Sequence, residues 1–225
     1  MNTGNSIRPE PFETPMPTPS FRVRPATPAD RDAAYAVCLQ TGDSGKDGTA
    51  LHPEDPDALG NLYVGPYLVF EPDLSFVLED AQGVCGYVLA ALDSAAFYRR
   101  YLEEWLPAMR ARHPDPAGDP SSWTPTQHLH HEFHRPQIHF PDSFHAYPAH
   151  LHIDLIARAQ GQGQGRRMME HQLAALRAKR SPGVHLGLSA VNHRAYEFYR
   201  KLGFHELARV GEPVPEVIYM GLLLP

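Results

Sequence analysis

Cysteine is scarce in this chain, and this scarcity excludes a disulfide framework and a cysteine-based metal site. The 225 residues contain two cysteines, Cys38 and Cys85, and neither has a partner at metal or redox spacing. Each lies among apolar neighbours, in an expected helix and an expected strand respectively. We therefore predict that both are small hydrophobic residues buried in the core.

Basic residues and long apolar runs are also few. Twenty lysines and arginines stand against twenty-six acidic residues, and the formal charge of −6 argues against nucleic acid as a partner. No apolar stretch is long enough to span a bilayer, and no basic amino-terminal region precedes an apolar segment. These absences predict a cytoplasmic protein that binds neither nucleic acid nor a membrane.

Proline, in contrast, is abundant and divides the chain. Five prolines between Pro9 and Pro19, with few apolar side chains around them, predict an extended or disordered tail over residues 1–20. With 42% hydrophobic residues in the whole chain, residues 21–225 suffice for one packed core and therefore for a single domain. An inserted segment at about residues 93–147 is expected to act as a specificity element, because long loops in compact domains are often functional. A loop without a function is the alternative for its part rich in proline and histidine.

The most informative run is Gln-Gly-Gln-Gly-Gln-Gly-Arg-Arg at residues 160–167. Alternating apolar residues over 150–156 predict a strand before it, and apolar residues at helical spacing from Met168 to Arg177 predict a helix after it. Its glycines permit close approach of the backbone, and the free amides at a helix start attract an anion such as a pyrophosphate. A plain glycine-rich connector is the alternative.

Two common nucleotide motifs do not fit this run. A dinucleotide site requires Gly-x-Gly-x-x-Gly and an acidic residue after the next strand, whereas that strand ends here at Ser189. A P-loop requires a following Gly-Lys-Ser or Gly-Lys-Thr, which the run lacks. Nicotinamide and flavin cofactors are therefore disfavoured, and nucleotide hydrolysis has no support.

The strand, the pattern Gln-x-x-Gly-x-Gly at residues 160–165 and the helix together resemble the acetyl-coenzyme A signature of the GNAT acyltransferase superfamily. A second run, Asn-x-x-Ala-x-x-Phe-Tyr-x-x-Leu-Gly-Phe at residues 192–204, is similar to the pantetheine-side helix of that superfamily. The resemblance implies an α/β fold of the GNAT type. Its central sheet is mixed, mostly antiparallel, splayed between strands four and five, and flanked by helices.

A closer resemblance, over roughly residues 60–220, is to the acetyltransferase-like domain of animal O-GlcNAcases and its stand-alone bacterial relatives. The animal domain has a degraded glycine loop, whereas this chain keeps the glycines, which favours a working cofactor site. The runs that carry the resemblance are Gly65-Pro66-Tyr67-Leu68, Ser75-Phe76-Val77-Leu78-Glu79-Asp80, Cys85-Gly86-Tyr87, His152-Ile153-Asp154, Glu197-Phe198-Tyr199 and Leu202-Gly203.

Local signals predict the elements that precede the glycine run. Thr27 and Pro28 predict the start of a helix that reaches about Gln40, and Asp55 and Pro56 predict another that reaches about Tyr63. Strands are expected at residues 21–24, 75–79 and 84–91, with the last two joined by a hairpin turn. Aromatic and apolar residues from Tyr98 to Met109 predict an amphipathic helix disturbed by Pro107.

The resemblance implies an N-acetyltransferase that moves an acetyl group directly from acetyl-coenzyme A, its cosubstrate, to a primary amine. Asp154 is expected to act as the base or to orient the amine, with His152 as the alternative base, and Tyr199 as the acid for the thiolate. Asn192 is expected to bind pantetheine, to cap a helix, or both. The expected cofactor-binding residues are Leu155, Ile156, Ala157, Gln160, Gly161, Gln162, Gly163, Gln164, Gly165, Arg166, Arg167, Asn192 and Tyr199.

Two other functions stay open at this point. The domain could bind acetyl-coenzyme A or a protein partner without catalysis, or its histidines could bind a metal. Eight of the fourteen histidines lie between His128 and His152. His150, His152 and Asp154 share one strand face, but no further ligand at fixed spacing completes a zinc set, so no metal is expected. The acceptor amine is open, and we expect a monomer or a homodimer paired through the carboxyl-terminal strands.

Overall fold

The computed structural model describes residues 20–211 and 216–225. The tail predicted for residues 1–20 therefore lies, apart from Ser20, outside the described residues. Among the described residues, no helix combines the length and the apolar character needed to cross a bilayer.

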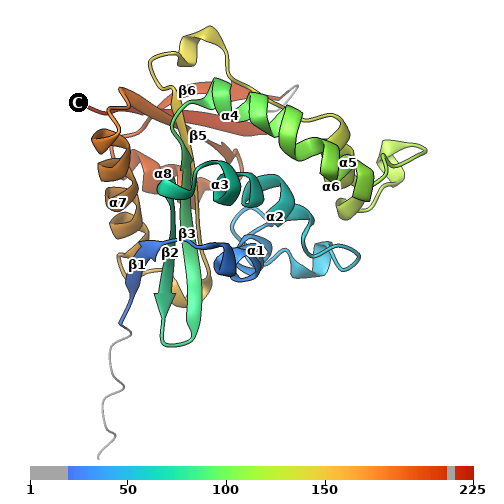
Figure 1. Cartoon of the computed structure of the whole chain (residues 1–225), viewed down its shortest axis with the longest axis horizontal. Helices are drawn as coiled ribbons and strands as arrows, with labels where there is room; N and C mark the ends of the chain where they lie inside the picture. Colours follow the sequence, from blue (N-terminus) through green and yellow to red (C-terminus); the bar gives the residue numbers. More distant parts are fainter. Residues whose placement is uncertain (1–19, 212–215) are drawn as a thin grey trace, which may run out of the picture.

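A seven-stranded sheet with the order β1-β2-β3-β4-β5-β7-β6 forms the centre of the structure (Figure 1). All neighbouring strands are antiparallel except β4 and β5, which are parallel. The mixed, mostly antiparallel sheet predicted from the sequence is confirmed. The strands are β1 (Arg22–Pro25), β2 (Ser75–Asp80), β3 (Gly83–Ala91), β4 (Ala149–Leu155), β5 (Gly183–Ser189), β6 (His205–Val210) and β7 (Val217–Leu223).

The sheet opens between β4 and β5, as predicted. These strands are paired only at Ala149 with Val184 and at His150 with His185. Beyond His150, β4 stays paired with β3 as far as Leu155, whereas β5 stays paired with β7 along its whole length. The two strands therefore diverge, and each leaves one backbone edge unpaired along the gap.

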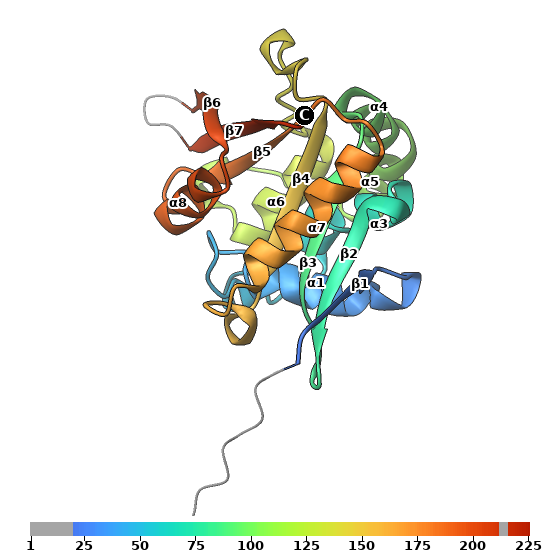
Figure 2. The same cartoon turned by 90° about the vertical axis from the view of Figure 1, so that its left-hand side faces the viewer.

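Helices cover both faces of the sheet. Figure 2 shows α7 crossing in front of the sheet, where it packs against β3 and β4. Helix α1 contacts the same two strands from the opposite side, beside α2 and α3. The α-helices are α1 (Arg31–Leu39), α2 (Ala58–Tyr63), α3 (Gly65–Phe70), α4 (Ser94–Arg100), α5 (Leu106–Arg112), α6 (Pro125–His134), α7 (Gln164–Ala178) and α8 (His193–Lys201).

The helix predicted from Thr27 to about Gln40 is confirmed, with a short 3₁₀ turn, Pro28–Asp30, at its start and an α-helical part that ends at Leu39. The helix predicted from Pro56 begins later, at Ala58. A helix directly after Tyr63 was missed, because α2 and α3 follow one another with a break at Val64. Pro66 has no amide hydrogen to continue α2, but it fits the first turn of a new helix, where no donor is needed.

The inserted segment begins as one long helical stretch from Ser94 to Arg112. It contains a π-helical turn, Tyr101–Trp105, in which the Leu106 amide donates to the Tyr101 carbonyl. This wide turn ends directly before Pro107, which cannot donate to the carbonyl four residues earlier. The predicted disturbance is thus observed. Apolar side chains of this helical stretch form a second buried cluster with side chains of α2 and α6. Its members are Leu62, Tyr101, Leu106, Met109 and Phe133.

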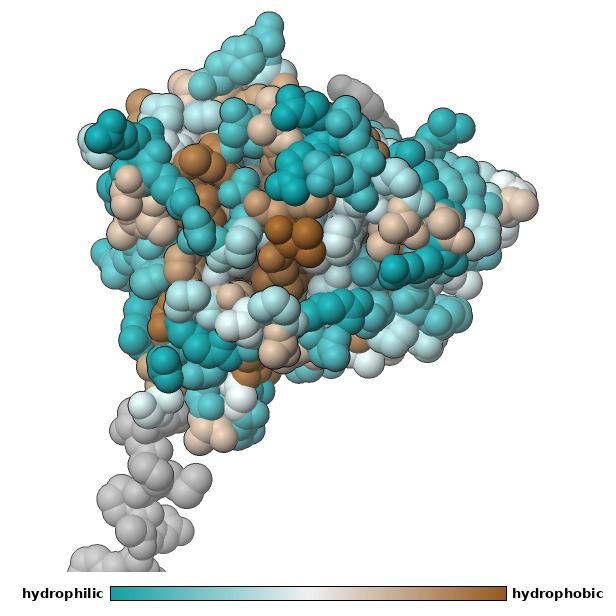
Figure 3. Space-filling model, in the orientation of Figure 1, coloured by the Kyte–Doolittle hydropathy of each residue, from teal (hydrophilic) through white to brown (hydrophobic). Residues whose placement is uncertain are grey.

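Apolar side chains gather between the layers, and the outer surface is mostly polar. Figure 3 shows separate apolar areas among hydrophilic side chains on the face seen in Figure 1. Both cysteines are buried and free, as predicted. Burial raises the pKa of Cys38 to about 12 and that of Cys85 to about 11, so both are neutral thiols at physiological pH.

Two buried histidines on adjacent strands make the stability of the fold sensitive to acid. Burial lowers the pKa of His150 on β4 and of His185 on β5. Below pH 6.5 the unfolded chain therefore binds protons that the folded chain does not. The free energy of unfolding then decreases by about 1.4 kcal/mol per pH unit for each histidine, until the pH reaches its folded pKa.

We expect the melting temperature to fall by about 5 °C between pH 6.5 and pH 5.5. Calorimetry over this range measures the slope. His150→Gln should flatten the slope, whereas His145→Gln, at a side chain that is 67% exposed, should leave it unchanged. An equally steep slope in His150→Gln would contradict the assignment.

Candidate functional site

A cavity of about 770 Å³ opens where β4 leaves β5. Four segments line it: the loop after α1, the end of β4, the glycine run with the start of α7, and residues 191–199 at α8. The glycine run and the Asn192 helix were predicted to meet at one site, and both line this cavity. The loop after α1 was not predicted to take part, although Thr41, Ser44, Gly45 and Lys46 form one wall.

The glycine run makes the turn into α7. Gly161 and Gly163 have backbone φ angles of 73° and 75°, which residues with a side chain rarely adopt. Gly163 caps α7, and a Cβ atom at either glycine would point into open space. A Cβ at Gly165 would come within 3.4 Å of the Phe198 ring. The turn thus brings the free amides at the start of α7 to the cavity wall, where an anion is favoured.

Gln160 joins the two sides of the cavity. Its Nε2 donates to the Leu155 carbonyl at 2.6 Å, and its Oε1 accepts from Arg194 of α8 at 2.7 Å. Its side chain is therefore used to hold the end of β4 to α8. The other glutamines of the run also bond locally, since Gln162 donates to the Arg158 carbonyl and Gln164 to the Gln162 carbonyl.

The unpaired edge of β4 differs slightly from the expectation. The Ile156 amide donates to the Cys85 carbonyl of β3 at 3.0 Å, so it points away from the gap. Because backbone groups alternate along a strand, those of Leu155 and Ile153 point into the gap. Leu155 and Ile153 line the cavity, whereas Ile156 and Ala157 do not.

The charge of the cavity is opposite to that of the chain. Lys46, Arg166 and Arg194 line it, and Asp154 is the acidic residue that lines it. Arg194 bonds to a neutral amide, whereas Arg166 pairs with Glu170 on the exposed side of α7. Arg167 points elsewhere, because it donates to the Phe21 carbonyl. The cavity is therefore cationic in a chain with a formal charge of −6.

Asn192 and Tyr199 both line the cavity from α8. The Asn192 Oδ1 accepts from the Ala195 amide at 3.0 Å, so this side chain caps the helix. Tyr199 is buried, and this burial, together with the nearby charge of Asp154, raises its pKa. The phenol consequently keeps its proton at physiological pH and can serve as a proton donor.

Asp154 contacts two side chains, Tyr87 and His152, and only His152 was predicted from the sequence to belong to the site. Its Oδ2 accepts from the Tyr87 hydroxyl at 2.6 Å and lies 2.9 Å from His152 Nε2. The imidazole of His152 is stacked between Tyr63 and Tyr87, at centroid distances of 5.8 and 5.7 Å. Tyr87 is paired with Asp154 across β3 and β4. The contact between Tyr87 and Asp154 was not predicted, because the sequence does not show which residues 67 positions apart are paired across two strands.

A second, smaller pocket of about 120 Å³ lies on the other side of His152. Asp154 lines the large cavity and His152 lines the small pocket, so this pair connects the two spaces. Burial raises the pKa of Glu132, the carboxylic acid in the pocket. The remaining lining residues are mainly aromatic or apolar: Leu62, Tyr63, Tyr67, Phe97, Tyr98, Tyr101, Pro136, Gln137 and Ile138.

Comparisons with known proteins place this arrangement in context. Residues 141–206 match the family described as acetyltransferase (GNAT) domain. The crystal structure of SsHAT is 39% identical with a TM-score of 0.82, and the match covers 92% of this chain and all of that one. The structure of Salmonella typhimurium yncA with its cofactor acetyl-CoA has a TM-score of 0.51 at 16% identity, which shows a shared fold alone.

The match to full-length curated proteins covers only part of their length. Protein O-GlcNAcase of Rattus norvegicus is 30% identical over 215 residues, which are 93% of this chain but 23% of that protein. The same protein of Mus musculus is 30% identical over 214 residues. This chain therefore spans about a quarter of the length of these relatives.

Proposed function

Because the chain belongs to the GNAT family of acetyltransferases, we propose that it transfers an acetyl group from acetyl-coenzyme A to a primary amine. One observation carries this proposal. The close pair His152 and Asp154 lies where a large cationic cavity, suited to the cofactor, meets a small aromatic pocket, suited to an amine. The two substrates can thus meet beside the pair.

The large cavity supports binding of acetyl-coenzyme A. The pyrophosphate would accept hydrogen bonds from backbone amides of the turn at residues 161–165 and at the start of α7. Lys46, Arg166 and Arg194 would attract its phosphates from three sides. The pantetheine arm would bond to the free edge of β4 at Leu155 and Ile153, as an added strand does.

The reaction forms one bond and breaks another at the thioester carbonyl carbon, and it requires two proton transfers. The amine nitrogen bonds to the thioester carbonyl carbon, the carbon–sulfur bond breaks, and its electron pair stays on sulfur. The amine loses a proton to a base, and the thiolate takes a proton from an acid. Tyr199 is the proposed acid, because its phenol is buried, protonated and at the cavity wall.

His152 and Asp154 are proposed to share the role of the base. An aspartate of ordinary pKa is a weak base for an amine, whereas an imidazole matches neutral pH. With His152 Nε2 2.9 Å from Asp154 Oδ2, Nδ1 is the ring nitrogen proposed to accept the proton. Asp154 would then orient the imidazole and stabilise its charged form, with Tyr87 holding the carboxylate in place.

The small pocket supports an alkyl amine as the acceptor. Its volume of about 120 Å³ equals that of about four water molecules in the liquid, which suits a short chain better than a whole sugar ring. Faces of Tyr63, Tyr67 and Tyr98 favour a cation, and Glu132 offers a carboxylate at 3.5 Å from the Tyr63 hydroxyl. These groups would hold an ammonium ion before it loses its proton to His152.

Binding of acetyl-coenzyme A is the first expected outcome, measured by calorimetric titration with coenzyme A as the comparison. Gly163→Val should abolish binding, because the valine side chain would enter the cavity and strain the turn at φ 75°. Gly118→Val is the matched control, since Gly118 has φ 89° and open space around it but lies in the inserted segment. Normal affinity in Gly163→Val would show that the loop does not hold the cofactor.

Asp154→Asn and Tyr199→Phe should each lower kcat about 100-fold and leave the affinity for acetyl-coenzyme A nearly unchanged. His152→Gln should have a similar effect if the imidazole accepts the proton. A coupled thiol assay with butylamine or a lysine peptide measures turnover, with His145→Gln as the control at an exposed histidine. Unchanged turnover in Asp154→Asn and Tyr199→Phe would contradict the proposed roles of these two residues. If the unaltered chain binds the cofactor but transfers no acetyl group, the domain is non-catalytic.

Glu132→Gln should raise KM for the amine about tenfold with little change in kcat, because it removes the carboxylate that holds the ammonium ion. Affinity for acetyl-coenzyme A should not change. Glu103→Gln is the matched control, because Glu103 is an exposed glutamate of the same inserted segment and does not line the pocket. An unchanged KM in Glu132→Gln would mean that the amine enters by another path.

A further inference from the structure

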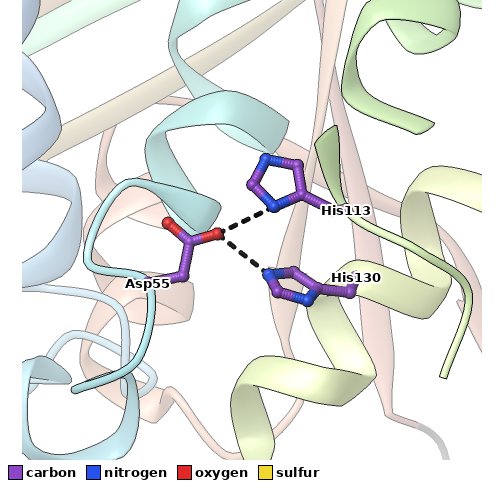
Figure 4. A group of neighbouring side chains, drawn as sticks. All are labelled: Asp55, His113 and His130. Atoms are coloured by element: carbon purple, nitrogen blue, oxygen red, sulfur yellow. Dashed lines mark hydrogen bonds and ion pairs between the residues drawn. The ribbon is translucent and has the colours of Figure 1, made fainter. Parts of the chain in front are cut away.

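Three side chains from separate segments converge at a site that neither cavity includes. Figure 4 shows the carboxylate of Asp55 directed at the rings of His113 and His130. Asp55 precedes α2, His113 follows α5, and His130 lies in α6. The ligand atoms that they offer all lie within 4.8 Å of one another. We propose that Asp55, His113 and His130 bind one divalent transition-metal ion, with Zn²⁺ as the best match.

The distances fit a zinc ion with a small adjustment. Asp55 Oδ2 lies 2.9 Å from His130 Nε2 and 3.2 Å from His113 Nδ1. In a tetrahedral zinc site, neighbouring nitrogen and oxygen ligands lie about 3.4 Å apart, as the bond lengths to zinc require. Small movements of the side chains would therefore separate Asp55 Oδ2 from the two nitrogen atoms far enough to admit the ion.

The chemistry of the set favours zinc among common ions. Two imidazoles and one carboxylate suit Zn²⁺, whereas calcium and magnesium prefer oxygen ligands alone. The side chains of Asp55, His113 and His130 are 14%, 17% and 20% exposed, so one position stays open to a water molecule. Binding would replace the protons between the carboxylate and the rings by the ion and release them.

Neighbouring groups hold the two imidazoles in position before any ion binds. The rings of His113 and His130 lie 4.7 Å apart, and both pack against the buried ring of Phe133. His134 Nε2 bonds to the His113 carbonyl at 2.8 Å and fixes that backbone at the end of α5. This support restricts both rings, as partners around metal ligands usually do.

The ion would connect the inserted segment to the body of the protein. His113 and His130 belong to the insert, whereas Asp55 belongs to the loop that leads into α2. The next element after Asp55 carries Tyr63, and α6 carries Glu132, so the connected helices also form the small pocket. We infer an ion with three protein ligands that holds α6 against α2. Its ligands do not line the large cavity, so its removal should not affect the binding of the cofactor.

The test uses the full chain, stripped of metal with a chelator and without a histidine tag, because a tag could bind zinc as well. The twelve histidines outside the site could also bind zinc weakly, so the stoichiometry is measured. Titration with Zn²⁺ should give one ion per chain, and Co²⁺ should give the visible absorption of a tetrahedral site. A hundredfold excess of Zn²⁺ over its Kd should raise the melting temperature by about 5–10 °C.

Asp55→Asn, His113→Gln and His130→Gln should each lose the one-to-one binding and the Zn²⁺-dependent shift. His131→Gln is the matched control, because His131 is next to His130 and also bonds to an aspartate, Asp115, at 2.7 Å. It should bind zinc normally. Asp55→Asn preserves the shape of the side chain, so this variant still tests the proposed metal site if a histidine variant fails to fold.

Two outcomes would overturn the proposal: no stoichiometric zinc binding by the unaltered chain, or equal binding by Asp55→Asn. Neither readout depends on acetyl transfer. Failure of the metal site is therefore distinguishable from failure of the proposed enzymatic function.

Discussion

The divergence of β4 from β5 is the constraint on which the site depends. Each strand keeps a complete partner on its other side, β3 for β4 and β7 for β5, so the gap does not weaken the rest of the sheet. Along the gap, however, backbone groups of β4 lack a strand to bond with. The Leu155 carbonyl bonds to the Gln160 side chain instead. The other groups must bond to water or to a ligand, and an extended ligand with amide groups satisfies them best.

The same strand also distributes three polar side chains over three environments. His150, His152 and Asp154 share one face of β4, since alternate residues of a strand do so. His150 lies in the part of β4 that is paired with β5, is buried, and bonds to Ser94 at 2.7 Å. His152 lines the aromatic pocket, and Asp154 lines the large cavity. Position along the strand therefore separates a histidine of the core from one that lines a pocket.

The sequence predicted the parts of the site that depend on local spacing. The glycine turn, the start of α7, the cap at Asn192 and the side of β4 that carries Asp154 all follow from motifs of a few residues. Those motifs also carried the resemblance from which the sheet and its opening were predicted. Hydrogen-bond partners of single side chains were harder to predict from the sequence. Gln160 is an example, because its side-chain amide bonds to both Leu155 and Arg194.

Contacts between distant segments were not predictable in the same way. Tyr87 reaches Asp154 through strand register, and the loop at residues 41–46 reaches the cavity through the packing of α1. The trio of Asp55, His113 and His130 arises because α5 and α6 fold back on α2. From the sequence, a metal site was considered at His150, His152 and Asp154 of β4 and not expected, whereas the fold brings a different pair of histidines together with an aspartate.

The proposed cofactor and acceptor sides come from different parts of the fold, and this separation has a consequence for specificity. The large cavity is built from the sheet opening, α7, α8 and the loop after α1. The small pocket is built mainly from α2 and the inserted segment, which packs on α2 through a separate apolar cluster. Changes in the insert can therefore alter the shape and charge of the pocket while the glycine turn stays intact. Such an arrangement allows one acetyl donor to be kept while the acceptor changes.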